Sequence, residues 1–192
     1  GEVEEKSFIS TGPSVGRQLR RNALIALALA LIAIILYVAF AFRKVSRPVS
    51  SWIYGVIAVV ALLHDVFIPT GIFSFLRIEI DALFVTALLT VLGFSVHDTI
   101  VVFDRVRENL RRSSTGNFEE LVERSLKETI TRSINTSLTT VLSLLAVYFF
   151  GGVATKNFAL ALIIGIIIGT YSSIFIASPL LVTVERWRRK RS

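Results

Sequence analysis

An acidic side chain interrupts an apolar run that is long enough to cross a membrane. Asp98 follows His97 within the segment 82–103, five residues before the end of that run. A carboxylate at such a depth costs about 2.5–3.5 kcal/mol on insertion scales, so a chain rarely keeps one there without a use for it. An acid in apolar surroundings can take up and release a proton as a cation approaches and withdraws. We therefore predict that Asp98 is protonated and deprotonated reversibly.

The partner that the sequence offers is Arg132, at the start of the apolar segment 133–150. A long guanidinium side chain directed inward from that boundary could reach the level of Asp98, and a paired charge is tolerated better than an isolated one. Two other interpretations stay open. Arg132 could extend to lipid headgroups without a partner, and Asp98 could serve only as a hydrogen-bonding group between helices.

A second acid follows a histidine at His64 and Asp65. We expect this pair near the opposite membrane face from Asp98, so that one metal site shared by both pairs is not predicted. The pair is either the outer half of a proton path or an interfacial feature without a function. The further polar residues that could belong to such a path are His97, Ser95, Thr99, Thr136 and Thr140.

The elements that must position these groups are membrane helices. The chain has 192 residues, of which 53% are hydrophobic, and a mean hydropathy of +0.69. About 20 apolar residues are needed to cross a bilayer as a helix. Five such segments occur, at 23–42, 49–68, 82–103, 133–150 and 158–182. The sequence thus predicts an all-α, polytopic membrane helix bundle over residues 17–185, preceded in 1–16 by the end of a truncated extracytoplasmic domain.

Two features concern the ends and the packing of these helices. Pro69 to Gly71 is expected to close the second span, and Asn117 to cap an amphipathic helix over 117–130 that rests on the membrane interface, as a connector or as a docking surface. The fifth span carries a small residue at every fourth position, which lets helix backbones approach closely. This stripe consists of Ala161, Gly165, Gly169, Ser173 and Ala177.

The charge pattern indicates a membrane orientation and no nucleic-acid partner. The net charge is +7, but the basic residues gather at the ends of spans and in the tail 186–192. Their excess on one side predicts a cytoplasmic C-terminus, although Arg17, Arg20 and Arg21 argue against it. The chain has no cysteine, no phosphate-binding loop and no pair of nucleophile and base. We therefore expect no enzyme activity, no metal and no cofactor other than protons.

The segment 91–109, VLGFSVHDTIVVFDRVREN, closely resembles the signature of the SecF family, accessory membrane subunits of bacterial Sec protein export. Shorter matches occur at 15–16, 64–66, 136–140 and 169–173. The resemblance implies five of the six helices of a domain of the resistance-nodulation-division superfamily. It further implies that Asp98 and Arg132 are the intramembrane pair on which proton coupling depends.

The same resemblance implies where the protein acts and with what. The expected site is the bacterial plasma membrane, and the expected partners are SecD, in a separate or fused chain, the SecYEG translocon, unfolded preprotein and membrane lipids. YajC and YidC are further candidates. Two other functions stay open at this point: a transporter of lipids or small hydrophobic molecules, as in the wider superfamily, and a passive membrane scaffold.

Overall fold

The computed structural model describes residues 13–42, 49–112 and 117–190, and within these ranges every regular element is a helix. The elements are α1 (Pro13–Ala41), α2 (Ser51–Phe75), α3 (Ala82–Arg112), α4 (Phe118–Phe150) and α5 (Val153–Ser172), which continues through one π-helical segment, η1 (Ser173–Ala177), into α6 (Ser178–Arg189). Five helices are long and apolar enough to cross a membrane, with α5, η1 and α6 forming the fifth. The predicted all-α membrane bundle is confirmed.

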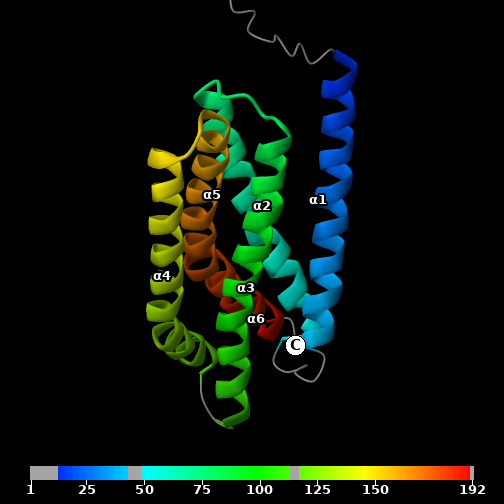
Figure 1. Cartoon of the computed structure of the whole chain (residues 1–192). Coiled ribbons are helices and arrows are strands. Elements are labelled where there is room, and N and C mark those ends of the chain that lie inside the picture. The colour runs from blue at the N-terminus through cyan, green and yellow to red at the C-terminus, as the bar shows by residue number, and fades with distance from the viewer. Residues whose placement is uncertain (1–12, 43–48, 113–116, 191–192) are drawn as a thin grey trace, which may run out of the picture.

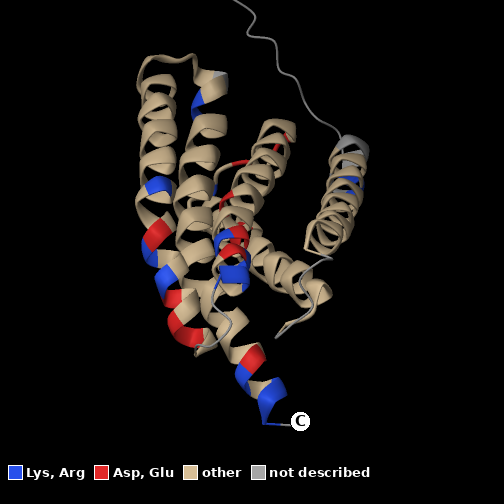
Figure 2. Ribbon diagram, turned by 90° about the horizontal axis from the view of Figure 1, so that it is seen from below, with Lys and Arg blue, Asp and Glu red and all other residues tan. Residues whose placement is uncertain are grey.

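The helices form a bundle with α2, α3 and α5 at its centre, flanked by α1 on one side and α4 on the other (Figure 1). α1 and α3 end at the same end of the bundle at which α2 and α4 begin and α6 ends. Figure 2 looks onto this end and shows Lys, Arg, Asp and Glu gathered there. We call it the charged end. Residues 1–12, which include most of the expected outer segment, lie outside the described ranges, and residues 13–16 form the first turn of α1.

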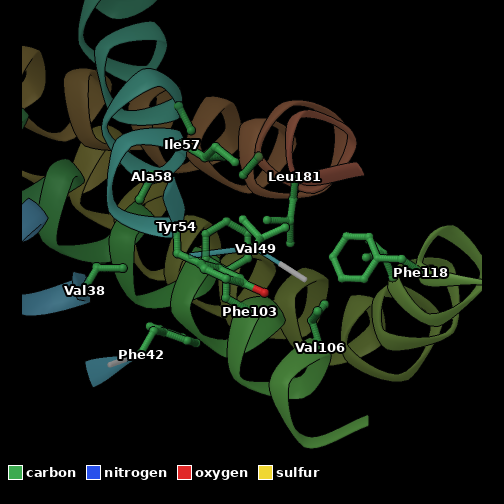
Figure 3. Packing of buried hydrophobic residues seen from close by; sticks show 13 residues of the cluster. Val38, Phe42, Val49, Tyr54, Ile57, Ala58, Phe103, Val106, Phe118 and Leu181 are labelled. Atoms are coloured by element: carbon green, nitrogen blue, oxygen red, sulfur yellow. The ribbon is translucent and has the colours of Figure 1, made fainter. Parts of the chain in front are cut away.

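An aromatic cluster joins the helices at the charged end (Figure 3). The rings of Phe42 and Tyr54 stack with centroids 5.2 Å apart, and Phe103 meets both rings edge-on. This cluster ties the end of α1 to α2 and α3. Toward its other end α1 leaves the bundle, and Leu24 and Leu29 are 59% and 62% exposed. The apolar surface of α1 there is available to lipid or to another membrane helix.

α3 and α5 approach each other closely at the two glycines of the fifth span. A Cβ atom at Gly165 would lie 2.3 Å from a methyl carbon of Val91, and one at Gly169 would lie 3.0 Å from Cβ of Ser95. A side chain at Gly165 would force Val91 or α3 to move, and one at Gly169 would require Ser95 to give way by a few tenths of an ångström. The other members of the small-residue stripe, Ala161, Ser173 and Ala177, are fully buried.

The expected end of the second span is wrong, because α2 continues through Pro69 to Phe75. Proline lacks the N–H that would bond the carbonyl four residues earlier, here that of Asp65. Membrane helices tolerate this loss where neighbouring polar groups compensate. The hydroxyl of Thr70 donates to the carbonyl of Val66 at 2.7 Å in the same turn.

The expected separation of an interfacial helix at 117–130 from a fourth span is also wrong. Asn117 caps the helix through a hydrogen bond from the N–H of Glu119, but α4 then continues without a break to Phe150. No proline or glycine lies within it. Its inward face is a row of small hydroxyl residues rather than an apolar stripe alone: Ser125, Thr129, Ser133 and Ser137 are all buried.

Candidate functional site

Asp98 lies in the middle of α3 and points into the bundle. Asp98 is 8% exposed, and its Oδ1 accepts a hydrogen bond of 2.5 Å from the hydroxyl of Ser133 on α4. Oδ2 is buried and has no hydrogen-bond partner of normal length among the described residues, although the hydroxyl of Ser173 on η1 is close enough to act on the carboxyl. A buried polar atom without a partner is rare in folded proteins and calls for an explanation such as strain, chemistry or a bound ion or water. The carboxyl therefore has one oxygen that is open to a proton.

Arg132 on α4 directly precedes Ser133, the hydrogen-bond partner of Asp98, but no hydrogen bond or ion pair joins Arg132 to Asp98. The Arg132 side chain is exposed and makes no ion pair within 4 Å with any residue of the described ranges. It lines a cavity of about 380 Å³ between α3 and α4, together with Asp104 and Glu128. Its charge nevertheless acts on the Asp98 carboxyl. The structure thus places the two groups near each other without joining them.

The second acid, Asp65, is fully buried at the centre of the bundle. Its Oδ2 accepts hydrogen bonds from Ser95 on α3 and from Ser172 on α5, the latter at 2.9 Å, and its Oδ1 lies 3.1 Å from Nδ1 of His64. His64 is partly exposed, and its ring stacks near that of Tyr171. Three helices therefore meet at this one carboxyl.

Asp65 and Asp98 lie closer together in depth than the sequence predicts. Because α2 extends to Phe75, Asp65 lies ten residues before the end of its helix, about 15 Å along the axis at 1.5 Å per residue. Its partner Ser95 precedes Asp98 by one turn of α3, on the same face. Asp65 on α2 is therefore bonded to the turn of α3 that precedes Asp98, and the two acids belong to one polar region.

The π-helical segment η1 lies beside this region. Its first residue, Ser173, shares a hydrogen bond of 2.8 Å with Thr99, which follows Asp98 directly. The hydroxyl of Ser178 donates to the carbonyl of Ser173 at 3.1 Å and so gives this carbonyl a hydrogen-bond partner within the π-helical turn. Single π-turns occur often at functional sites. Here the turn separates the fifth span into two helices at the level of Asp98.

Several residues of this site were not identified from the sequence. Ser133 and Ser172 are the direct partners of the two acids, and Ser137 bonds Thr170 at 2.5 Å between α4 and α5. Serines are common in membrane helices as packing residues, so composition alone does not distinguish them. A signal was present in the spacing of Ser125, Thr129, Ser133 and Ser137, because four-residue intervals mark one helix face.

Other predicted path residues do not join the site. Thr136 and Thr140 donate to carbonyls of their own helix, those of Arg132 and Thr136, and His97 is exposed on the outside of α3. Ser95 and Thr99 are buried and belong to it. The structure thus brings together Asp98, Thr99, Ser95 and Asp65, and leaves Thr136, Thr140 and His97 on other surfaces.

At the charged end, Glu128 on α4 is bonded to two donors on α3, Arg105 and Asn109, and to Arg124 on its own helix. It accepts hydrogen bonds from Arg105 at 2.6 Å, Asn109 at 2.9 Å and Arg124 at 3.0 Å. The bonds from Asn109, Arg105 and Arg124 lower the pKa of Glu128 to about 2. Glu128 therefore stays ionised at neutral pH and fixes α4 against α3 one turn before Arg132.

The chain is similar over nearly its whole length to known export proteins. Residues 1–187 match the family described as "Protein export membrane protein SecD/SecF, C-terminal". The protein translocase subunit SecF of Thermobaculum terrenum is 58% identical over 189 residues, which cover 96% of this chain and 59% of that protein. The protein translocase subunit SecDF of Thermus thermophilus is 43% identical over 95% of this chain and 23% of its own length.

A solved structure agrees with these matches. The crystal structure of SecDF in its super-membrane-facing form superposes with a TM-score of 0.81 at 42% identity, covering 94% of this chain and 23% of that chain. The chain spans about three fifths of the length of the SecF relatives that it matches, 59%, 60% and 57% in three of them.

Proposed function

The chain belongs to the SecD/SecF family of protein-export membrane proteins, and from that premise we propose that it is a proton-driven accessory subunit of Sec-dependent protein export. In this proposal Asp98 takes up and releases a proton, and Arg132 approaches it when it is ionised. The resulting movement of α4 against α3 assists the passage of unfolded preprotein. Each charge that crosses the membrane field supplies about 2.3 kcal/mol per 100 mV.

The observation that carries this proposal is the buried oxygen of Asp98 that has no donor. In the ionised state this oxygen is uncompensated, and protonation or an approaching cation would each relieve it. Arg132 is the nearby cation, and its guanidinium is not committed to another ion pair within the described ranges. Two arrangements of the same pair, joined and apart, are what a coupling device requires.

The proposed setting follows the names of the relatives. The similarity to a fused SecDF supports SecD as the partner, either as a separate chain or as part of a longer one. We further propose the SecYEG translocon, with YajC and YidC as additional contacts, in the bacterial plasma membrane. The charged end then faces the cytoplasm and brings the C-terminus with it, because basic residues are retained on that side.

Substitution of the two central residues tests the proposal. Asp98→Asn and Arg132→Met, in the full-length chain with its partner in reconstituted vesicles, are expected to fold normally and to abolish gradient-dependent export. Asp104→Asn and Arg124→Met are the matched controls, since both residues lie on the same helices and are largely exposed, with side-chain exposures of 59% and 71%. Full gradient-dependent export by both central variants would refute the proposal. A fall in melting temperature of Asp98→Asn that matches its loss of export would favour the passive scaffold.

One observation favours a second candidate, a transporter of lipids or small hydrophobic molecules. A groove of about 450 Å³ lies where α1 leaves α2 and α3, and its lining is almost wholly apolar, including Leu27, Phe67 and Leu88. Leu27→Trp would fill this groove, and Leu36→Trp, at a residue of α1 that is 54% exposed and outside the groove, is the control. Lipid movement that is lost in Leu27→Trp while export continues would support the second candidate.

A further inference from the structure

A polar cavity lies between α3 and α4 at the charged end of the bundle. Its volume is about 380 Å³, and five of its eight lining residues carry a charge. Two of these, Asp104 and Glu108, have side chains that are 59% and 41% exposed, so the cavity opens to the surface there. A water molecule takes up about 30 Å³ in the liquid, so a charged space of this size has room for about a dozen waters.

The inner end of this cavity lies one helical turn from Asp98. Val101 lines the cavity and follows Asp98 by three residues on α3, and Thr129 lines it and precedes Ser133 by four residues on α4. Residues three or four apart lie on the same face of a helix. Because Ser133 donates to Asp98, the cavity ends about 5 Å, or one turn, from the hydrogen-bonded pair along both helices.

The opposite side of Asp98 is closed by packed side chains. One turn beyond Ser133 on α4, Ser137 bonds Thr170 of α5 at 2.5 Å. Beyond that level an apolar cluster joins α2, α3 and α5, and its members Phe84 and Val91 are only 2% and 1% exposed. These two residues lie seven positions apart on α3, which makes the cluster about 10 Å deep at 1.5 Å per residue. A close-packed apolar interior leaves no room for water.

We propose that the cavity is the entrance through which Asp98 exchanges protons with water at the charged end, and that the structure is the state in which the opposite side is closed. This inference rests on the proposed function of Asp98 and adds the side from which its proton comes or goes. Arg132 lines the same cavity, so it is surrounded by water when it stands apart from Asp98. Net proton transport then requires a second state in which the apolar cluster opens and the cavity closes.

A charged thiol reagent that cannot cross the membrane tests where water reaches. The sequence contains no cysteine, so Val101→Cys supplies a single thiol in a cysteine-free full-length chain, studied with its partner in vesicles of both orientations. We expect labelling only from the charged-end side. Val102→Cys, at a residue 1% exposed, and Leu138→Cys, at a residue of α4 that is 53% exposed but outside the cavity, are the controls. Thiols react as thiolates, which apolar surroundings disfavour, so both controls should react at least about tenfold more slowly.

Each half of the inference has a result that overturns it. Val101→Cys that reacts from the opposite side, or no faster than Val102→Cys, would show that the cavity does not bring water toward Asp98 from the charged end. Val91→Cys lies in the apolar cluster and should react from neither side. Rapid labelling of Val91→Cys from the opposite side would show that this side is open.

Blocking the cavity after folding tests whether protons use it. A bulky thiol reagent bound to Val101→Cys in assembled vesicles should abolish gradient-driven export, and the same treatment of the cysteine-free protein should leave export unchanged. The protein is already folded when the reagent is added, so the loss is not a folding defect. Unchanged export by fully labelled Val101→Cys would overturn the inference. If Asp98→Asn exports normally, the proposed function fails, and the labelling pattern still decides which side of Asp98 water reaches.

Discussion

Gly165 sets the distance between α3 and α5, and Gly165→Ala is expected to destabilise the bundle. Its new Cβ atom would lie 2.3 Å from one methyl carbon of Val91 and 2.9 Å from the other. Carbon atoms in good contact are about 3.5–4.0 Å apart, so the helices must separate by roughly 1 Å or more. The Val91 side chain cannot simply turn away, because a β-branched residue has one strongly preferred rotamer in a helix.

The expected cost of this substitution is about 1–3 kcal/mol, the usual range for overpacking a filled interior. It is measured as the free energy of unfolding in detergent micelles or in bilayers. Gly93→Ala on α3 is the control, since a Cβ at Gly93 would meet no atom within 4 Å. Val91→Ala removes both methyl carbons, so in the double variant Val91→Ala with Gly165→Ala the overpacking cost should largely disappear.

Two results would refute this reasoning. One is a Gly165→Ala protein as stable as Gly93→Ala. The other is a double variant in which the two costs simply add, which would mean that the two side chains do not meet. The same spacing lets Ser95 on α3 and Ser172 on α5 both reach the carboxyl of Asp65, so a wider gap should weaken export together with stability.

Three further predictions concern the charged end and the cap of α4. Glu128→Gln should lower the free energy of unfolding at neutral pH. The pKa of Glu128 in the folded protein is about 2, below the ordinary value of 4.5, so its stabilisation is complete above pH 4.5 and is lost as the pH falls through the folded pKa. Unfolding curves of the wild type and of Glu128→Gln should therefore converge as the pH falls toward 2. Phe103→Ala removes the ring that meets Phe42 and Tyr54 edge-on and should cost about 3–5 kcal/mol in unfolding free energy, whereas an equal stability would show that the cluster does not hold α1. Asn117→Ala removes the side-chain oxygen that accepts a hydrogen bond from the N–H of Glu119 and should cost about 0.5–2 kcal/mol of unfolding free energy. Amide exchange should become faster only in the first turn of α4; exchange that speeds up evenly along the helix would contradict a local cap.

The two wrong boundaries have physical reasons. Pro69 was expected to end a helix because proline does so in water, where the freed carbonyl is readily hydrated. In a membrane a chain that leaves its helix exposes several polar groups to lipid, so continuing through the proline costs less. Residues 117–130 were separated from the fourth span because their pattern is amphipathic, but an amphipathic turn also suits the part of a membrane helix that extends beyond the lipid.

The sequence by itself determined the class of this protein, its five membrane helices, the close packing expected at Gly165 and Gly169, and the presence of an acid in the third span. Each of these follows from residues along one segment, because the length and polarity of a run decide whether it crosses a membrane. The tertiary structure alone decided which polar groups meet: that Ser133 bonds Asp98, that Asp65 bonds Ser95 one turn before Asp98, and that Arg132 makes no ion pair with Asp98. In water the apolar side of a helix marks its buried face, but in a membrane lipid covers apolar residues such as Phe67, which is 69% exposed, while Ser172 is fully buried. Periodicity therefore does not show which face of a membrane helix points inward, and the partners of a buried acid depend on how the helices are rotated against one another.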